Sequence, residues 1–465
     1  MKQYNFAYLI FLSFVAALGG FLFGYDTAVI SGTTNMVAAQ FSLDTISLGW
    51  YVGCALIGSI CGVLAAGVMG DYLGRKNSMI IAAVLFTVSA AGCAICQDFD
   101  QLVIYRIIGG VGIGIASIIC PLYISELAVA EYRGRLVSCY QLAITIGFLG
   151  AYLVNFGLLN YSQTAIAGSS LFDKVFVSEV WRGMLGMETI PALLFFLVIF
   201  IIPESPRWQI LRGKVDAARA TLSRVYLIPG EADHQIAESQ KVSGKTEGGE
   251  IKMLFSPGIF KALLIGVGIA ILGQFMGVNA VLYYGPKIFE DAGLSGGDSL
   301  FYQVMIGLVN TITTIIALAI IDKVGRKKLI YWGVGGMIIS LLLIAFYFTF
   351  GASLGISSLF LLVFFLAYIF CCAISICAVV WVILSEMYPV KVRGIAMSIA
   401  GLALWIGTYL IGQLTPWLLQ AATPAGTFII FAVMCVPYVL IMWKLVPETT
   451  GKTLEEIEQY WTKKK

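Results

Sequence analysis

The sequence predicts an all-α polytopic membrane protein, with twelve transmembrane helices in two six-helix, pseudo-symmetric bundles. Three observations carry this prediction. First, 59% of the 465 residues are hydrophobic and only 12% are charged, about half the charged fraction of soluble domains. Second, apolar runs of roughly 20 residues or more, long enough to cross a bilayer, recur along the chain. Third, short polar motifs recur in the same order in both halves.

The apolar runs predict the individual spans. The first run is too long to be the apolar core of a cleaved signal peptide, so we expect it to remain as the first span. The expected spans are 6–33, 46–69, 77–97, 101–126, 135–158, 183–202, 259–289, 300–321, 329–350, 357–386, 394–420 and 426–446. These spans predict an N-terminal six-helix bundle over 1–202, a linker over 203–258, a C-terminal six-helix bundle over 259–446 and a tail over 447–465.

The distribution of lysine and arginine predicts the orientation. Net charge is only +3, but basic residues gather in alternate connections, including Arg75–Lys76, Lys323–Lys328 and the three terminal lysines. Cytoplasmic loops carry such an excess, so both termini are predicted to be cytoplasmic in a multi-pass protein of the cytoplasmic membrane. The linker alternates basic and apolar residues at helical spacing, which predicts short amphipathic helices at the membrane surface.

Three charged motifs recur at matched places in the two halves. Asp-x-x-Gly-Arg-Lys follows the second and eighth spans, Ser-Glu with Arg-Gly follows the fourth and tenth, and Pro-Glu follows the sixth and twelfth. Such a repeat is how one class of transporter builds a midplane site between two bundles. We expect these charges to form a cytoplasmic gate and latch, and the alternative is that they are topogenic charges and helix caps. They are Asp71, Arg75, Glu126, Arg133, Glu204, Asp322, Arg326, Glu386, Arg393 and Glu448.

Three ionisable residues fall inside predicted spans at similar depth: Asp26, Arg106 and Glu188. An aspartate at the centre of a membrane helix costs roughly 3 kcal/mol on insertion scales. A carboxylate and a guanidinium at equal depth favour pairing, because each offsets the desolvation of the other. The functional interpretation is a proton site at Asp26 that alternates between pairing and separation. A fixed structural pair is the alternative. Glu188 is a relay, a second partner, or an outer-end charge in a hydrated region.

Amides and aromatic residues inside the spans indicate the ligand. Gln141 opens the fifth span, and Gln274 and Asn279 lie in a seventh span interrupted by glycine and proline. Trp381 and Trp405 lie in the tenth and eleventh spans. Amides pair with hydroxyls, and sugar C–H faces pack on indole rings, so this set predicts a neutral polyhydroxylated ligand. Amide hydrogen bonding between helices and interfacial tryptophans are the alternatives.

The chain resembles the sugar porter family of the major facilitator superfamily over nearly its full length. The segments that carry the resemblance are GYDTAVISG, GDYLGRK, RIIGGVGIGIAS, YISELA, YRGRLVS, PESPRW, GVNAVLYYGPKIF, DKVGRKKL, WVILSEMYPVKVRG and PETTGKTLEE. The resemblance implies a proton-coupling carboxylate at Asp26 with Arg106 as its partner. Uniporters of the family have asparagine at this place, so the acid favours symport.

The resemblance also implies roles at the ligand site. Gln141, Gln274 and Asn279 match sugar-binding amides, and Trp381 matches the tryptophan beneath the sugar. Tyr283 and Tyr284 match the outer gate. Four positions depart from the family pattern and remove polar contacts or the usual Gly-Pro hinge of the tenth span: Gly273, Phe148, Ala378 and Leu404. The departures predict a less hydroxylated sugar, or a sugar bound in another pose.

These observations predict a monosaccharide–proton symporter that works by alternating access, functions as a monomer in the lipid bilayer and binds no nucleic acid. No cofactor is expected beyond the proton as coupling ion. An uncoupled facilitator is the main alternative. A sugar sensor would want a longer cytoplasmic tail, and an enzyme would need an intramembrane metal cluster or nucleophile–base pair. Cys93 and Cys96 form a CxxC that we interpret as apolar packing, and His234 lies in a polar loop.

Overall fold

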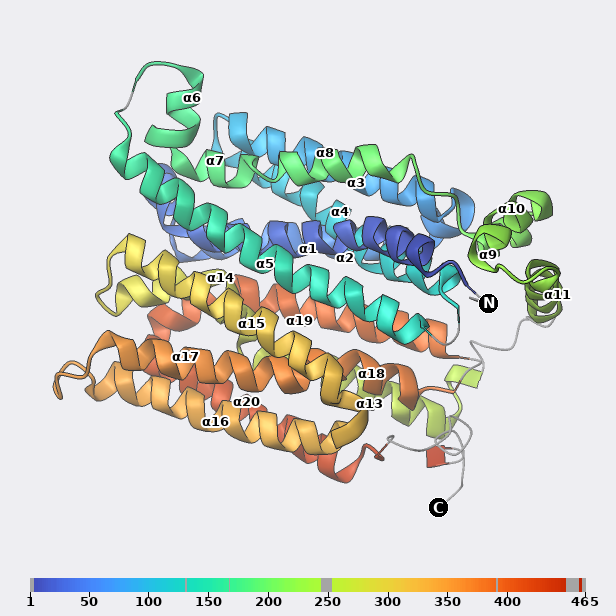
Figure 1. Ribbon diagram of the computed structural model, residues 1–465. Coiled ribbons are helices and arrows are strands. Elements are labelled where there is room, and N and C mark those ends of the chain that lie inside the picture. Colours follow the sequence, from blue (N-terminus) through green and yellow to red (C-terminus); the bar gives the residue numbers. More distant parts are fainter. Residues whose placement is uncertain are drawn as a thin grey trace. The chain divides into compact units, whose positions relative to one another are not determined.

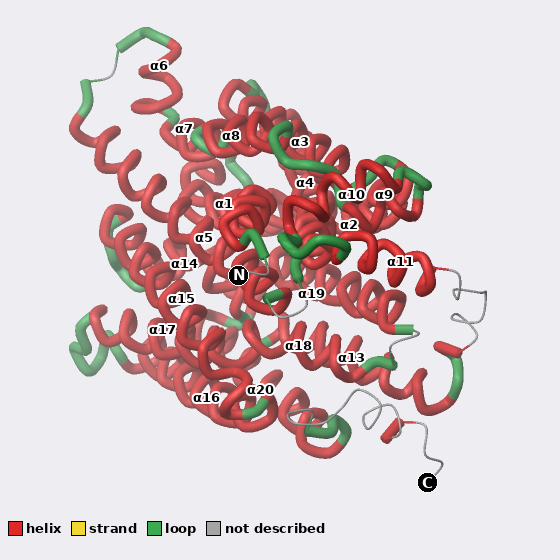
Figure 2. The backbone as a smooth tube through the Cα atoms, turned by 45° about the vertical axis from the view of Figure 1, so that its right-hand side comes forward, coloured by secondary structure: helices red, strands yellow, loops and turns green. Residues whose placement is uncertain are grey.

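The computed structural model describes residues 4–129, 132–166, 168–243, 253–389, 392–448 and 460–461. Helices account for nearly all of these residues (Figure 2). Twelve helical segments in the described part of the chain are long and apolar enough to cross a membrane. The predicted number of spans and the all-α fold are therefore confirmed.

Nine of the crossings are formed by α1 to α5, α15, α16, α19 and α20, and three are interrupted (Figure 1). The continuous helices are α1 (Phe6–Phe41), α2 (Thr45–Tyr72), α3 (Arg75–Ile95), α4 (Phe99–Leu127), α5 (Arg133–Thr164), α15 (Gly296–Val324), α16 (Arg326–Phe350), α19 (Arg393–Ala421) and α20 (Thr423–Lys444). The interrupted crossings are α7 with α8 (Val180–Gly186, Thr189–Ile199), α13 with α14 (Pro257–Phe275, Val278–Asp291), and α17, η2 and α18 (Ser358–Cys372, Ala373–Cys377, Ala378–Met387). The short α6 (Leu171–Asp173) and η1 (Lys174–Ser178) precede α7.

The first helix continues beyond its predicted end at residue 33 and finishes at Phe41. The polar side chains at the predicted end form hydrogen bonds within the helix. The Thr33 hydroxyl donates to the Ile30 carbonyl at 2.8 Å, and the Thr34 hydroxyl donates to the Ser31 carbonyl at 3.3 Å. Because these side chains bond to the preceding turn, they remain buried without breaking the helix.

Each interrupted crossing has its own local cause. Between α13 and α14, Gly277 adopts a left-handed conformation with φ of 91°, which glycine tolerates and other residues rarely adopt. Between α7 and α8, Met187 and Glu188 form a turn. The tenth crossing passes through a π-helical turn, η2. This turn directly precedes Ala378, so the crossing changes its winding although the usual Gly-Pro is missing.

Contacts divide the chain into two compact units. The first comprises Met1–Val29, Ile57–Val154 and Ile166–Glu247, and the second comprises Ile30–Leu56, Asn155–Ala165 and Gly248–Lys465. In the first unit α3 packs against α4, α7 and α8, and in the second unit α13 packs against α19 and α16 packs against α17 and α20. This grouping follows contacts and cuts α1, α2 and α5. The division into two six-helix bundles with a linker and a tail follows the sequence repeat and stays a prediction.

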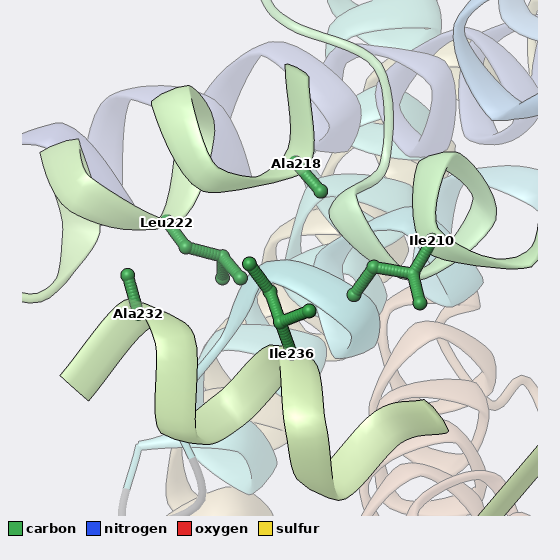
Figure 3. Packing of buried hydrophobic residues seen from close by; sticks show 5 residues of the cluster. All are labelled: Ile210, Ala218, Leu222, Ala232 and Ile236. Carbon is green, nitrogen blue, oxygen red and sulfur yellow. The ribbon is translucent and has the colours of Figure 1, made fainter. Parts of the chain in front are cut away.

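The linker contains the expected amphipathic helices, α9 (Pro206–Leu211), α10 (Val215–Val225) and α11 (Glu231–Ser243). Their apolar side chains pack against one another in a small core (Figure 3), formed by Ile210, Ala218, Leu222, Ala232 and Ile236. The apolar faces are therefore covered by neighbouring linker helices. Mutual packing therefore uses part of the amphipathic pattern, and contact of the linker with the membrane surface stays a prediction.

Candidate transport site

Asp26 and Arg106 meet in the interior of the first unit. Asp26 on α1 is 0% exposed and Arg106 on α4 is 3% exposed. The Arg106 guanidinium donates to Asp26 Oδ1 and lies 3.4–3.5 Å from the Asp26 carbonyl oxygen. The predicted pairing of these two residues is confirmed. A buried pair of this kind requires both charges, because either one alone would be uncompensated.

The second carboxylate oxygen of Asp26 has different surroundings. Asp26 Oδ2 is buried and has no hydrogen-bond donor in the described part of the chain. It faces α4 at Gly109, where an added Cβ would lie 2.8 Å from Oδ2 and 2.5 Å from the Ser89 hydroxyl. Glycine therefore permits α4 to approach this carboxylate closely. One oxygen of Asp26 is engaged by an arginine, and the other lies against α4 without a donor among the described residues.

Glu188 lies at the break between α7 and α8 and is 2% exposed. Its Oε1 atom is buried without a hydrogen-bond partner among the described residues. The carboxylate interacts electrostatically with Asp26 and Arg106. Full burial argues against an outer-end charge in a hydrated region and favours a second carboxylate that shares the field of Arg106.

In the second unit, the two predicted amides of the seventh crossing meet each other. Asn279 Nδ2, on α14, donates to Gln274 Oε1, on α13, at 2.7 Å. The Thr408 hydroxyl, on α19, lies 3.2 Å from the same oxygen and 2.9 Å from the Leu404 carbonyl. Gly407 packs against Gln274, because a Cβ at this position would lie 3.2 Å from Gln274 Cγ. The side-chain oxygen of Gln274 is thus engaged by groups from α14 and α19.

The aromatic residues of the predicted site differ in their surroundings. Trp381 on α18 is 37% exposed, whereas Trp405 on α19 is 5% exposed. Tyr283 and Tyr284 are both buried on α14, and the Tyr284 hydroxyl donates to the Gly412 carbonyl of α19 at 2.6 Å. Trp381 is therefore the more accessible of the two tryptophans, while Tyr284 ties α14 to α19.

Gln141 and the departing positions complete the predicted set. Gln141 is half-buried on α5 of the first unit. Phe148, on the same helix, is 8% exposed and packs edge-on against Tyr152. Gly273 adjoins Tyr438 and Ile376, where an added Cβ would find ordinary contacts at 3.8 and 3.6 Å. Apolar and aromatic groups therefore adjoin two positions at which the family resemblance implies polar side chains.

A latch in the first unit forms around Arg75, the first residue of α3. Its guanidinium donates to both carboxylate oxygens of Glu126 at 2.9 and 3.0 Å, and to the Gly70 carbonyl at 2.6 Å. The Ser205 hydroxyl also donates to Glu126. Glu204 accepts the backbone N–H of Arg75 at 3.0 Å and so satisfies the open first turn of α3. Burial raises the pKa of Glu204 above its usual value, against the opposing effect of these hydrogen bonds.

The same arrangement recurs in the second unit. Arg326 Nη2 donates to Glu386 at 2.9 Å, and Glu448 accepts the backbone N–H of Lys327 at 3.2 Å. Arg393 donates to the Tyr388 carbonyl at 3.3 Å. The side chain of Asp322 lies outside the described part of the chain. Each latch therefore ties helices within one unit, and the repeat in the sequence is also a repeat of contacts.

Two members of the first motif set lie at the edge of this network. Asp71 contacts Arg75 at 3.4 Å, but its side chain is 77% exposed. Because the Asp71 carboxylate is exposed to solvent, this contact contributes about 0–1 kcal/mol. Arg133 is exposed at the start of α5, while Glu126 is bonded by Arg75. The shared Glu-Arg spacing of the second motif therefore does not identify the partner of Glu126.

Thr408 and Ser205 form polar contacts that the sequence analysis did not predict. Thr408 follows the altered position Leu404 by four residues, so it lies on the same face of α19. Ser205 belongs to the PESPRW segment and also caps α9 through the Trp208 N–H at 3.3 Å. Helical spacing from Leu404 was the available signal for Thr408. The described residues contain no group of three side chains suited to a metal ion.

The helices, the buried ion pair and the duplicated latches together define a secondary transporter of the major facilitator superfamily. The chain matches the family model described as "Sugar (and other) transporter" over residues 12–461. The chain therefore belongs to the sugar transporter family. Its relatives are membrane transporters rather than enzymes, and the protein is a multi-pass membrane protein.

Particular relatives are similar along their whole lengths. The chain is 37% identical over 464 residues to the arabinose-proton symporter of Bacillus subtilis, covering 99% of this chain and 97% of that protein. It is 38% identical over 493 residues to the D-xylose-proton symporter of Escherichia coli, with the same coverage of 99% and 97%. Among solved structures, the inward-open xylose transporter XylE of E. coli has a TM-score of 0.83 at 35% identity, covering 97% of this chain and 100% of that chain.

Proposed function

We propose that this protein couples the inward movement of a proton to the uptake of a monosaccharide by alternating access. The buried pair of Asp26 and Arg106 carries the proposal. An acid at this depth is costly unless it is paired or used. The relatives named as arabinose-proton and D-xylose-proton symporters support the same function.

The coupling follows from the chemistry of the pair. A proton that reaches Asp26 neutralises the carboxylate and removes most of its attraction for Arg106. Arg106 then interacts more strongly with Glu188, the second buried carboxylate in its field. This exchange of partners favours closure of the outer face, and release of the proton on the inner side restores the original pair. The proton is the coupling ion, and no cofactor takes part.

The sugar is held by amides and an indole ring. Gln274 and Asn279 present one amide donor and one amide acceptor to a hydroxyl, and the exposed face of Trp381 packs against sugar C–H groups. The family resemblance assigns a further sugar-binding amide to Gln141, on α5 of the first unit. Because Phe148 and Gly273 lack polar side chains, the site favours a sugar with few hydroxyls, and a pentose is the first choice. Trp405, Tyr283 and Tyr284 support or close this site.

The duplicated latches belong to the cytoplasmic gate in this proposal. Arg75 and Arg326 hold their carboxylate partners within each unit, so that the ends of α3 and α16 move as parts of rigid bodies. The excess of lysine and arginine in alternate connections supports a cytoplasmic position for both termini. One chain contains every residue that the cycle uses, so the protein functions as a monomer.

Sugar-driven proton movement tests the proposal. Sugar added to cells or right-side-out vesicles that contain the protein should make a weakly buffered medium more alkaline. A panel of labelled pentoses, hexoses, deoxysugars and polyols identifies the ligand. Sugar uptake without any alkalinisation would instead establish the uncoupled facilitator.

A further inference from the structure

The tenth crossing contains a π-helical turn and a pair of thiols, to which the proposed transport cycle assigns no role. Between α17 and α18 the chain winds as a π-helix over Ala373–Cys377. Single π-helical turns inside α-helices are uncommon and often mark functional positions. Trp381, the exposed indole of the ligand site, lies one helical turn after this segment. A change in the winding of η2 would therefore rotate and shift the ligand-facing part of the same crossing.

Two thiols lie on opposite ends of this π-helical turn. Cys372 and Cys377 are five residues apart, and their sulfur atoms are 3.6 Å apart. In a regular α-helix, residues five apart point about 140° away from each other. The i to i+5 hydrogen bonding of a π-helix instead brings them onto one face. The proximity of the two thiols thus depends on the π-helical winding.

The two sulfur atoms are in van der Waals contact but are not bonded. A disulfide has an S–S length of about 2.05 Å, so side-chain rotation must bring the sulfurs nearer by roughly 1.5 Å. Cys372 is buried at 1% exposure, while Cys377 is half-buried. The neighbouring Cys371 points elsewhere, because its sulfur lies against Gly336 of α16. The chain therefore provides one matched pair and one adjacent thiol as a control.

We propose that Cys372 and Cys377 are an oxidation site that closes to a disulfide in the presence of a hydroperoxide. The more accessible Cys377 thiolate attacks the peroxide, becomes a sulfenic acid and releases hydroxide. The Cys372 thiol then attacks that sulfur and displaces water. In sum, two thiols and one hydrogen peroxide give one disulfide and two water molecules. A dithiol reductant reverses the bond through thiol–disulfide exchange.

The disulfide locks the winding of η2. Straightening the turn to α-helix would separate the two sulfurs, and a covalent bond forbids that separation. An oxidised protein is therefore held with its tenth crossing in one geometry, and any step that rewinds this crossing stops. The effect on uptake rests on the proposed transport function, whereas formation of the bond does not.

Two measurements test the oxidation site on the purified, full-length protein in lipid nanodiscs and proteoliposomes. After treatment with hydrogen peroxide, free thiols are alkylated and the peptides are analysed by mass spectrometry. We expect the peptide containing Cys372 and Cys377 to lose two hydrogens and to escape alkylation at both positions. Cys371→Ser should retain this bond, and Cys372→Ser should lack it. Full alkylation of both thiols after peroxide would overturn the proposal.

Sugar uptake tests the lock. Peroxide should abolish uptake by the unmodified protein, and dithiothreitol should restore it. The double variant Cys372→Ser/Cys377→Ser should keep its uptake in peroxide. A fully formed disulfide with unchanged uptake would refute the lock. If untreated protein transports no sugar of the panel, the proposed function fails, but mass spectrometry still decides whether the oxidation site exists.

Discussion

Replacing Asp26 by asparagine separates coupling from binding. The side chain keeps nearly the same volume and one oxygen for Arg106, but it cannot take up a proton at physiological pH. Arg106 is 3% exposed, and a buried charge that loses its partner destabilises a protein by about 3–5 kcal/mol. The retained amide oxygen reduces this cost, so we expect a folded variant of lower thermal stability.

The accumulation ratio gives the magnitude of coupling. One charge moving across 100 mV is worth about 2.3 kcal/mol, and about 1.4 kcal/mol corresponds to a factor of ten. A transporter that carries one proton at Asp26 accumulates a neutral sugar roughly 45-fold at 100 mV, because 2.3 divided by 1.4 gives 1.6 decades. If Glu188 carried a second proton, the ratio would approach about 2,000-fold.

Proteoliposomes with an imposed membrane potential and labelled sugar provide the assay. Asp26→Asn should reduce the accumulation ratio to about one, while exchange of labelled for unlabelled sugar continues. Glu188→Gln is the matched variant: an unchanged ratio shows that Asp26 alone couples. Undiminished accumulation by Asp26→Asn, in protein that is folded by size-exclusion chromatography, would refute the role of this aspartate.

Three further variants test the ligand site, the helix break and the latch. Thr408→Val removes the hydroxyl that reaches the amide pair. The loss of a hydrogen bond worth about 0.5–1.5 kcal/mol should weaken equilibrium sugar binding by roughly 2- to 12-fold. Equal sugar affinity in Thr408→Val and Thr408→Ser would contradict this expectation. Gly277→Ala places a Cβ at a positive φ and against an aromatic ring, so it should cost about 1–3 kcal/mol and lower the melting temperature in detergent. Gly67→Ala, where an added Cβ meets nothing within 4 Å, should not. Arg75→Gln leaves Glu126 as a buried anion and should destabilise the protein by about 3–5 kcal/mol, and a melting temperature equal to that of the unmodified protein would show that the latch is not needed for folding.

The buried polar contacts of the protein could be predicted from the sequence to different degrees. Asp26 and Arg106 could be paired from the sequence because both lie at equal depth in apolar spans, where each charge needs a partner. Thr408 could not be assigned in the same way. A threonine in an apolar helix most often bonds to its own preceding turn, and only the approach of α19 to α13 at Gly407 brings its hydroxyl to Gln274.

The latches and the linker show the same limit. Their charges were visible as duplicated motifs, but the motifs did not show that Arg75 from another helix binds Glu126. In the linker, the helical pattern of apolar residues was correct. The pattern predicts an apolar face but not its partner, and in the structure this face packs against the neighbouring linker helices.

The sequence by itself determined the number of membrane crossings, their all-helical nature, the internal repeat and the depth of the buried charges. A bilayer of fixed thickness sets the length of each apolar run, and its low polarity restricts charges to paired or functional places. Tertiary structure decided which side chains meet across helices and where a crossing changes its winding. Those outcomes depend on interhelical distances of a few ångströms, such as the contact between Cys372 and Cys377 across η2, and spacing along one chain does not encode them.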